Sequence, residues 1–465
     1  INNVAIGQKA LEELTTGDSN TAVGSLAGDA LTTSYSNTLL GSHAGRGLTV
    51  GDGENVFIGH SAGLDADNAT VDAIKNVYVG KSAGENLDDG QYNVAVGYKA
   101  METSSGGNNA LYNVAVGFTA LKAVTTGDSN VAIGALAGDA ITTGELNVAI
   151  GGQALSAATT TGSNVAVGYQ SGNAYTTETG KSVSVGTYAN AVATGNYNVS
   201  VGHGAQRGTT SGANNVAMGY EALSSSAGGG TALTGASNVA IGYQAGYTFG
   251  GAASSNICIG ASAGRSATTQ DELVLIGDGA GDAINDDAAD GTIAIGHQAL
   301  TALTDASGNT AIGYQAGAAI TTAINNTIIG YQAYDAEDAG GYNTIIGYSA
   351  AGGQAGAGTN CVYIGDSVAL TVNAAGSDKN TVVGTQAFTG GTTSNENNVV
   401  MGYQSMNHGS NAASHCTIIG TSAGQGNMTS AADGTVLIGR DAGAAITSGA
   451  GNTAIGYQAG VATVE

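Results

Sequence analysis

The sequence predicts an all-β fold, a parallel β-solenoid of the β-roll type, from three observations. A motif of the form N-[VT]-x-[IV]-G-x-x-A recurs 26 times along the 465 residues and leaves no segment for another kind of domain. Neighbouring copies are 16 to 23 residues apart, most often 17. With 78 Gly, no Pro and no Trp, the chain must bury small side chains repeatedly rather than build one large core. We therefore expect a single repeat domain over residues 1–465, made of about 26 coils of 17–18 residues.

The first element of each coil is the segment directly before the motif Gly. Residues three and one before it are apolar or Thr, and the first of the two is always β-branched, as in Val4 and Ile6 or Val131 and Ile133. Alternation with β-branched residues is typical of a strand. In a stack of coils each strand pairs with its copy about 4.8 Å away.

The second expected element follows the motif Gly by about seven residues. Many copies place Leu, Ile or Val there and then Thr-Thr, as at 31–33, 124–126, 141–143 and 320–322. This pattern predicts a second, weaker strand. Turn residues such as the Gly-Asp-Ser-Asn segments at 17–20 and 127–130 separate the two, so two strands and two turns complete one coil.

An Asn stands four residues before the motif Gly in 20 of the 26 copies. Stacked amides can form hydrogen bonds along the axis of a solenoid, and Asn tolerates tight corners. Glycosylation, the alternative, needs N-x-[ST], which these positions mostly lack. We expect a structural Asn ladder that includes Asn3, Asn20, Asn93, Asn130, Asn164, Asn238, Asn309 and Asn452.

The two faces of the strand are both apolar. We expect the residues three and one before Gly to fill the coil and the residue between them to face outward. That middle residue is apolar in 24 of 26 copies, with Ser184 and Ser200 as exceptions, and is Ala in 12. A strand that is apolar on both faces is normally buried on both. The pattern therefore predicts side-by-side association of parallel chains, and we favour a homotrimer.

Tyr follows the motif Gly in nine copies, and Phe118, His60, His203 and His297 occupy the same position elsewhere. The three His lie many coils apart, so they do not form a metal or catalytic site. The Tyr residues either stack for stability or form a stripe that contacts carbohydrate or protein. This aromatic stripe consists of Tyr98, Tyr169, Tyr220, Tyr243, Tyr314, Tyr331, Tyr348, Tyr403 and Tyr457.

Composition excludes several classes of partner. A formal net charge of −24 repels nucleic acid and anionic membranes, and no apolar run is long enough for membrane insertion. Three Cys with no metal-binding spacing predict free thiols rather than a disulfide framework. The chain begins at Ile1 inside a motif copy, which suggests a processed or partial product.

No motif predicts catalysis or a cofactor. The segment Gly59 to Gly63 matches the hydrolase pattern G-x-S-x-G, but the same pattern recurs at 80–84, 260–264 and 420–424 on repeat positions. We expect Ser61 to be a repeat residue and the protein not to be an enzyme. Ca²⁺ is the one cofactor that we keep open, on recurrent turn carboxylates at Asp18, Asp29, Asp128, Asp139 and Asp282.

The copies "NVAIGYQAG" at 238–246 and "NTAIGYQAG" at 309–317 and 452–460 resemble the head repeats of trimeric autotransporter adhesins of the YadA type. They are equally similar to repeats of bacteriophage tail-fibre proteins. The resemblance covers nearly the whole chain and implies a left-handed parallel β-roll, three chains side by side, and attachment to a cell surface. It predicts an extracellular or virion location and a glycan or protein receptor.

Two other functions stay open at this point. A filament subunit that assembles with itself outside the cell fits a chain that starts and ends within motif copies. An ice-binding solenoid would need a regular T-x-T face, whereas the Thr residues here are irregular.

Overall fold

Each motif copy forms a three-residue β-strand that ends directly before the motif Gly, as the β-branched alternation predicts. The computed structural model describes residues 2–51, 53–65, 73–87, 89–103, 109–175, 180–192, 194–225, 232–285, 287–336, 340–353, 358–370, 377–389, 395–409 and 411–461. Within these residues the only helices are two 3₁₀ turns, η1 (Asp287–Ala289) and η2 (Ser430–Ala432). The chain is therefore all-β, and the predicted parallel β-solenoid is confirmed, with one strand in each of 26 coils.

The coils fall into two compact units. The first comprises Ile1–Ala227 and Ala232–Ala236. Successive strands in it pair in parallel and in register, so that Val4 lies opposite Thr21 and Ile6 opposite Val23. Its strands are β1 (Val4–Ile6), β2 (Thr21–Val23), β3 (Thr38–Leu40), β4 (Val56–Ile58), β5 (Val77–Val79), β6 (Val94–Val96), β7 (Val114–Val116), β8 (Val131–Ile133), β9 (Val148–Ile150), β10 (Val165–Val167), β11 (Val183–Val185), β12 (Val199–Val201) and β13 (Val216–Met218).

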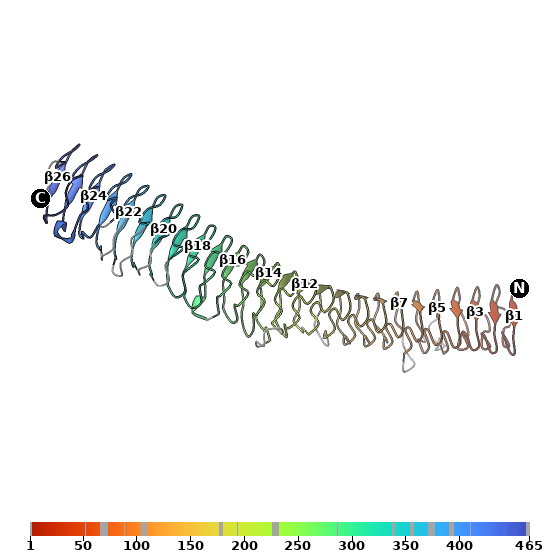
Figure 1. Ribbon diagram of the computed structural model, residues 1–465. Coiled ribbons are helices and arrows are strands. Elements are labelled where there is room, and N and C mark those ends of the chain that lie inside the picture. The colour runs from red at the N-terminus through yellow and green to blue at the C-terminus, as the bar shows by residue number, and fades with distance from the viewer. Residues whose placement is uncertain are drawn as a thin grey trace. The chain divides into compact units, whose positions relative to one another are not determined.

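The second unit comprises Gly228–Thr231 and Ser237–Glu465 and repeats the same coil. Its strands also pair in parallel and in register with their neighbours, as Thr310 does with Thr327. Within each unit, Figure 1 shows the strands at the same place in successive coils. They are β14 (Val239–Ile241), β15 (Ile257–Ile259), β16 (Val274–Ile276), β17 (Ile293–Ile295), β18 (Thr310–Ile312), β19 (Thr327–Ile329), β20 (Thr344–Ile346), β21 (Val362–Ile364), β22 (Thr381–Val383), β23 (Val399–Met401), β24 (Thr417–Ile419), β25 (Val436–Ile438) and β26 (Thr453–Ile455).

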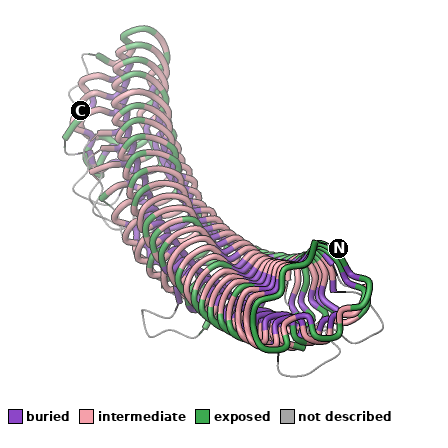
Figure 2. Tube along the Cα trace, turned by 90° about the vertical axis from the view of Figure 1, so that its right-hand side faces the viewer, coloured by how far each residue is buried: buried purple, intermediate pink, exposed green. Residues whose placement is uncertain are grey.

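The predicted orientation of the strands is wrong. The middle residue of the strand faces the inside of the coil: Ala22, Leu39 and Phe57 are fully buried, and so are the two exceptions Ser184 and Ser200. The flanking residues are half-buried or exposed instead. Buried residues accordingly line the inside of the coils in Figure 2. Alternation fixes two faces but does not say which is inner, and the frequent Ala reflects the narrow interior of a 17-residue coil.

In some coils, side-chain volume is exchanged between two interior positions. The large middle strand residue Phe57 goes with a small residue four after the motif Gly, Gly63, whereas in another coil Ile328 and Tyr334 are both large and fully buried. A Cβ on Gly63 would lie 2.3 Å from the Phe57 ring. Where the strand carries Ala149, the second position holds the buried Leu155. Where it occurs, this exchange keeps the interior close-packed although the coils differ in sequence.

The motif Gly is required by the stacking of the coils. Gly151 has φ +131°, and a Cβ there would lie 2.5 Å from the carbonyl oxygen of Gly168 in the next coil. Its N–H donates to the carbonyl of Ile133 in the preceding coil at 2.7 Å. Only a residue without a side chain combines this conformation with this contact.

The second strand predicted at the Thr-Thr segments is not formed in the described residues. Neighbouring segments are nevertheless bonded, since the N–H of Thr125 donates to the carbonyl of Thr142 at 2.9 Å. The Thr125 hydroxyl donates to the same carbonyl at 3.2 Å. Away from the named strands only isolated bridges occur in these residues, for example between Tyr35 and Gly53.

Candidate functional site

The predicted Asn positions form a hydrogen-bonded column on the inside of the coils. The Asn130 amide donates to the carbonyl of Gly144 at 2.8 Å, and its Oδ1 accepts the N–H of Asn147 at 3.0 Å. Asn452 differs, because its amide donates within its own coil, to Ser448 and Gly449. The bond from side-chain Oδ1 to the next coil's N–H recurs at Asn3, Asn20, Asn93, Asn164, Asn238 and Asn309. These amides join neighbouring coils where backbone groups would otherwise lack partners.

The aromatic stripe lies on the outside of the coils. One run of stacked rings consists of His297, Tyr314, Tyr331 and Tyr348, with centroids 5.0 to 5.3 Å apart and planes within 10°. Because each ring covers its neighbour's face, this run presents mainly ring edges and hydroxyls to solvent. All nine predicted members are exposed: Tyr98, Tyr169, Tyr220, Tyr243, Tyr314, Tyr331, Tyr348, Tyr403 and Tyr457.

A column of Gln residues, which the sequence analysis missed, runs beside the aromatic stripe. Gln315 donates its amide to Gln298, and Gln332 donates to Gln315, both at 2.9 Å. Gln in the "GYQAG" copies, always two residues after the motif Gly, is the pattern that would have predicted it. The column joins coils through side-chain amides, as the Asn ladder does.

The hydrolase-like Ser61 lies in a turn with φ +57°, not at the start of a helix. Its hydroxyl is 3.0 Å from Nδ1 of His60, and Ser42 lies at 2.8 Å from Nδ1 of His43 in the preceding coil. The rings of His43 and His60 are 5.7 Å apart, a proximity that the sequence analysis did not foresee. The arrangement lacks the strand-to-helix turn that defines a nucleophile elbow.

The turn carboxylates have two kinds of surroundings. Asp128 accepts the N–H of Leu111 at 2.7 Å, which completes an inter-coil bond. Asp29, Asp139 and Asp282 each have one buried oxygen without a partner in the described residues, and burial raises the pKa of Asp139 and Asp282. No group of three or more metal-binding side chains occurs in the described part of the chain. Ca²⁺ binding stays a prediction.

The three Cys are free and buried. Cys258 lies in the interior rather than on an outer face, and burial raises the pKa of its thiol to about 12. Cys361 and Cys416 occupy Asn-ladder positions, and burial raises the pKa of both thiols. Thiols with raised pKa are poor nucleophiles at neutral pH.

The outer face of the strands carries a mostly apolar row of side chains. It is formed by the residues three and one before each motif Gly, which are Val, Ile or Thr and Ile, Val, Leu or Met. We call it the strand face. Its exposed members include Ile58, Ile133, Met218, Ile312, Ile329, Val399 and Met401, each 36 to 41% accessible. This row was expected inside the coil, and the structure places it on the surface.

The longest intervals between motif copies predict projecting loops at Leu64–Lys75, Thr103–Ala110 and Leu223–Gly235. These loops lie largely outside the described residues, at 66–72, 104–108 and 226–231. Comparison with protein-family models, curated proteins and solved structures gives no match. Among the described residues no helix is long or apolar enough to span a membrane.

Proposed function

We propose that this chain is a non-enzymatic structural shaft of a phage tail fibre or adhesin that mediates attachment to a cell surface. Three chains lie side by side as a parallel homotrimer of left-handed coils, outside the cell or on a virion. The strand face carries this proposal. The resemblance of the "GYQAG" copies to adhesin and tail-fibre repeats supports it.

The strand face is suited to self-association because it repeats in every coil. Full burial of an Ile or Val contributes about 1.5–3 kcal/mol, so covering two half-buried residues contributes on the order of 1 kcal/mol per coil. One coil cannot offset the cost of association, about 4–15 kcal/mol, but the thirteen coils of one unit can. A monomer would leave a continuous apolar row in water.

Mass measurement on the full chain tests the association. Ile133→Lys combined with Ile150→Lys places two ammonium groups on the strand face. We expect at least about 100-fold weaker association in analytical ultracentrifugation, because these charges would be buried without partners. Thr126→Lys with Thr143→Lys is the matched control: it adds the same charges in neighbouring coils, at exposed positions away from the strand face. A stable wild-type monomer contradicts the proposal, and an open polymer would favour a filament subunit.

Ice binding is an alternative that depends on the Thr residues of the coils. Thr15, Thr125 and Thr142 use their hydroxyls as donors to carbonyls of the next coil. A hydroxyl held in this way is not arrayed for a flat water-binding face.

A further inference from the structure

Residues 146–220 differ from the rest of the chain in charge. The sequence has 35 acidic residues, and only Glu178 lies in this segment. The same segment contains Lys181 and Arg207. In the described residues neither forms an ion pair; they lie over the rings of Tyr197 and Tyr188, at 5.5 and 5.0 Å from the centroids. An anion therefore meets two cations without ion pairs here. Glu145 and Glu221 flank the segment, and the Glu145 carbonyl accepts the N–H of Ser163 at 2.8 Å.

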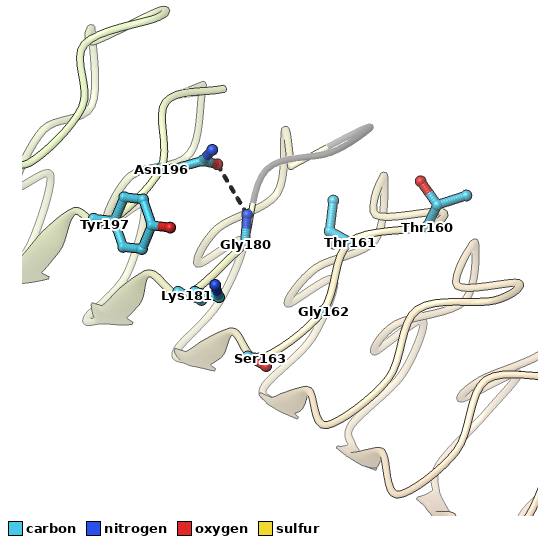
Figure 3. A pocket seen from close by; sticks show the side chains of 8 residues that line it. All are labelled: Thr160, Thr161, Gly162, Ser163, Gly180, Lys181, Asn196 and Tyr197. Carbon is cyan, nitrogen blue, oxygen red and sulfur yellow. Dashed lines mark hydrogen bonds between the residues drawn. The ribbon is translucent and has the colours of Figure 1, made fainter.

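A hollow of about 300 Å³ lies on this segment, at the corner that precedes strands β10, β11 and β12. Figure 3 shows the Tyr197 ring leaning towards the preceding coil, with its hydroxyl directed to the side of Gly180 and Lys181. Gly162 and Gly180 contribute backbone without side chains, which leaves the space open. The remaining lining residues are Thr160, Thr161, Ser163 and Asn196.

Some polar groups of the hollow already form hydrogen bonds within the protein, and others do not. Oδ1 of Asn196 accepts the N–H of Gly180 at 2.9 Å, which fixes the amide at the wall (Figure 3). Thr161 is 1% exposed, and its hydroxyl has no hydrogen-bond partner in the described residues. Tyr197 is 52% exposed and, in these residues, stacks on no other ring, unlike the stripe at Tyr314 to Tyr348. Lys181 lies over one face of this ring, so a ligand can contact Tyr197 at the ring edge, the hydroxyl and the other face.

The same coils depart from the repeat. Ser182 is the one residue of the first unit that replaces Asn in the ladder, and Ser184 and Ser200 are the two polar middle residues of all strands. The spacing between Gly186 and Gly202, 16 residues, is the shortest in the chain. Sites where a repeat breaks its own pattern are the places to expect a function beyond stability.

From these observations we infer that the hollow binds an acidic saccharide, with its carboxylate on Lys181 and its pyranose ring against Tyr197. Hydroxyls of Thr160 and Ser163 and the amide of Asn196 supply the donors and acceptors that sugar hydroxyls need. The lining has no large aliphatic side chain, which separates it from the apolar pockets that anchor peptides. A second hollow, near Glu102, is different because both of its cations, Lys99 and Lys122, lie against that carboxylate.

The inference rests on the proposed attachment function and names its ligand class. Each chain of an assembly would carry one such hollow, so several weak contacts would act together.

The test compares two sugars that differ only in the acid group, glucuronic acid and glucose, by saturation-transfer NMR and calorimetry on the full chain. We expect binding of glucuronic acid and at least about tenfold weaker binding of glucose, because a hydrogen bond to a charged group is lost. Lys181→Gln should remove the preference for glucuronic acid, and Tyr197→Ala should weaken the binding of both sugars. Equal binding of the two sugars, or none, overturns the inference.

Two matched variants separate the hollow from general charge. Lys379 occupies the same repeat position as Lys181, five residues before the motif Gly. In the next coil this position holds Asn397, where the hollow has Tyr197, so Lys379→Gln removes a comparable charge without the aromatic ring. Lys75→Gln removes a Lys that lies over Tyr92, 5.4 Å from its centroid, outside the hollow. Both variants should bind glucuronic acid like the wild type. A loss of binding in either variant contradicts a saccharide site in the hollow. If oligoglutamate competes better than glucuronic acid, the ligand is an acidic polypeptide and the saccharide assignment is wrong.

Circular dichroism and ultracentrifugation of the same samples make the two proposals separable. Lys181→Gln should keep its fold and its association. If Lys181→Gln loses sugar binding but still assembles, the proposal of a trimeric shaft is unaffected. If the wild type is a monomer that binds the sugar, the proposal of a shaft is contradicted and the proposal of a saccharide site in the hollow is supported.

Discussion

Two stretches of the first unit have the same backbone arrangement, but the side chains inside the coils are apolar in one and largely polar in the other. The regular coils, residues 130–155, fill the interior with apolar side chains such as Ala132, Ala149 and Leu155. The polar coils, residues 182–206, place Ser200 and Gln206 at the positions of Ala149 and Leu155. Strand pairing is parallel and in register in both. Inter-coil backbone bonds therefore define the fold, and the interior can change as long as its polar atoms find partners.

Partners are found for most of these polar atoms. The Ser200 hydroxyl donates to Oε1 of Gln206, and the Asn190 amide donates to the Tyr175 hydroxyl, which also lies 2.9 Å from the Ser184 hydroxyl. Oδ1 of Asn190 remains without a partner in the described residues. A buried unpaired acceptor costs about 1–3 kcal/mol, and the regular coils contain one as well, Oδ1 of Asp139, so this cost does not by itself separate the two stretches.

The largest effect should be common to both stretches, because both depend on the motif Gly. Gly151→Ala and Gly186→Ala each introduce a Cβ at φ above +130°, 2.5 Å from the next coil's carbonyl oxygen. We expect each to destabilise the chain by about 4 kcal/mol, measured by urea unfolding. Gly152→Ala is the control, since its Cβ would meet Tyr169 at an ordinary 3.4 Å. Tolerance of Gly186→Ala alone would show that the polar coils are not held by the same contact.

Residue patterns predicted the strands, their parallel stacking and the Asn column, because each depends on one residue type at one repeat position. They did not predict which strand face is inside. Val131, Ala132 and Ile133 are all apolar, and only the width of the finished coil decides that Ala132 fits within it. The three-dimensional packing also decides the neighbours of a residue, which is why the pairing of His43 with His60 was missed.

The hollow illustrates the same limit for a site. Lys181 and Tyr197 occupy the same repeat position in successive coils, five before the motif Gly, so the repeat predicts that they lie next to each other but not that a hollow forms beside them. Stacking brings them to one corner. The shortage of acids in residues 146–220 was present in the sequence, and a count of charge per segment would have drawn attention to it.

A smaller effect is expected from the Asn ladder, which is complete in the regular coils and interrupted in the polar ones. Asn130→Ala removes the acceptor of the Asn147 N–H and should cost about 2–3 kcal/mol. Ser182→Asn restores the ladder and should slow hydrogen exchange at Asn198, whose N–H now donates to the Ser182 hydroxyl at 3.2 Å. Thr126→Ala, at an exposed position, is the control and should change neither property. Slower exchange everywhere, rather than at Asn198, would argue against a local role.

The interiors can be exchanged directly. Ser200→Ala leaves Oε1 of Gln206 without its donor and should cost about 1–2 kcal/mol. Adding Gln206→Leu gives the Ala and Leu pair of the regular coils, and we expect the double variant to recover that loss in urea unfolding. The coupling between the two changes, measured by a double-mutant cycle, checks the explanation. Simple additivity would mean that the two side chains do not depend on each other.

The smallest effect concerns Asp139, in the regular coils. Burial raises the pKa of its carboxyl, an effect that its own backbone N–H and Lys122 partly offset, and one carboxylate oxygen has no partner in the described residues. A carboxyl with a raised pKa in the folded state disfavours folding once it is ionised. Stability should therefore rise as the pH falls from above this pKa towards the ordinary value of an aspartate, about 3.9.

Asp139→Asn should be more stable than the wild type at pH 7 and lose this part of the pH dependence. Because the carboxylate is partly exposed, solvent screens it and the gain stays below about 1 kcal/mol. Asp128→Asn removes the same charge from a group that accepts the Leu111 N–H, and it should bring no gain. An equal gain from both variants would trace the effect to net charge rather than to the burial of Asp139.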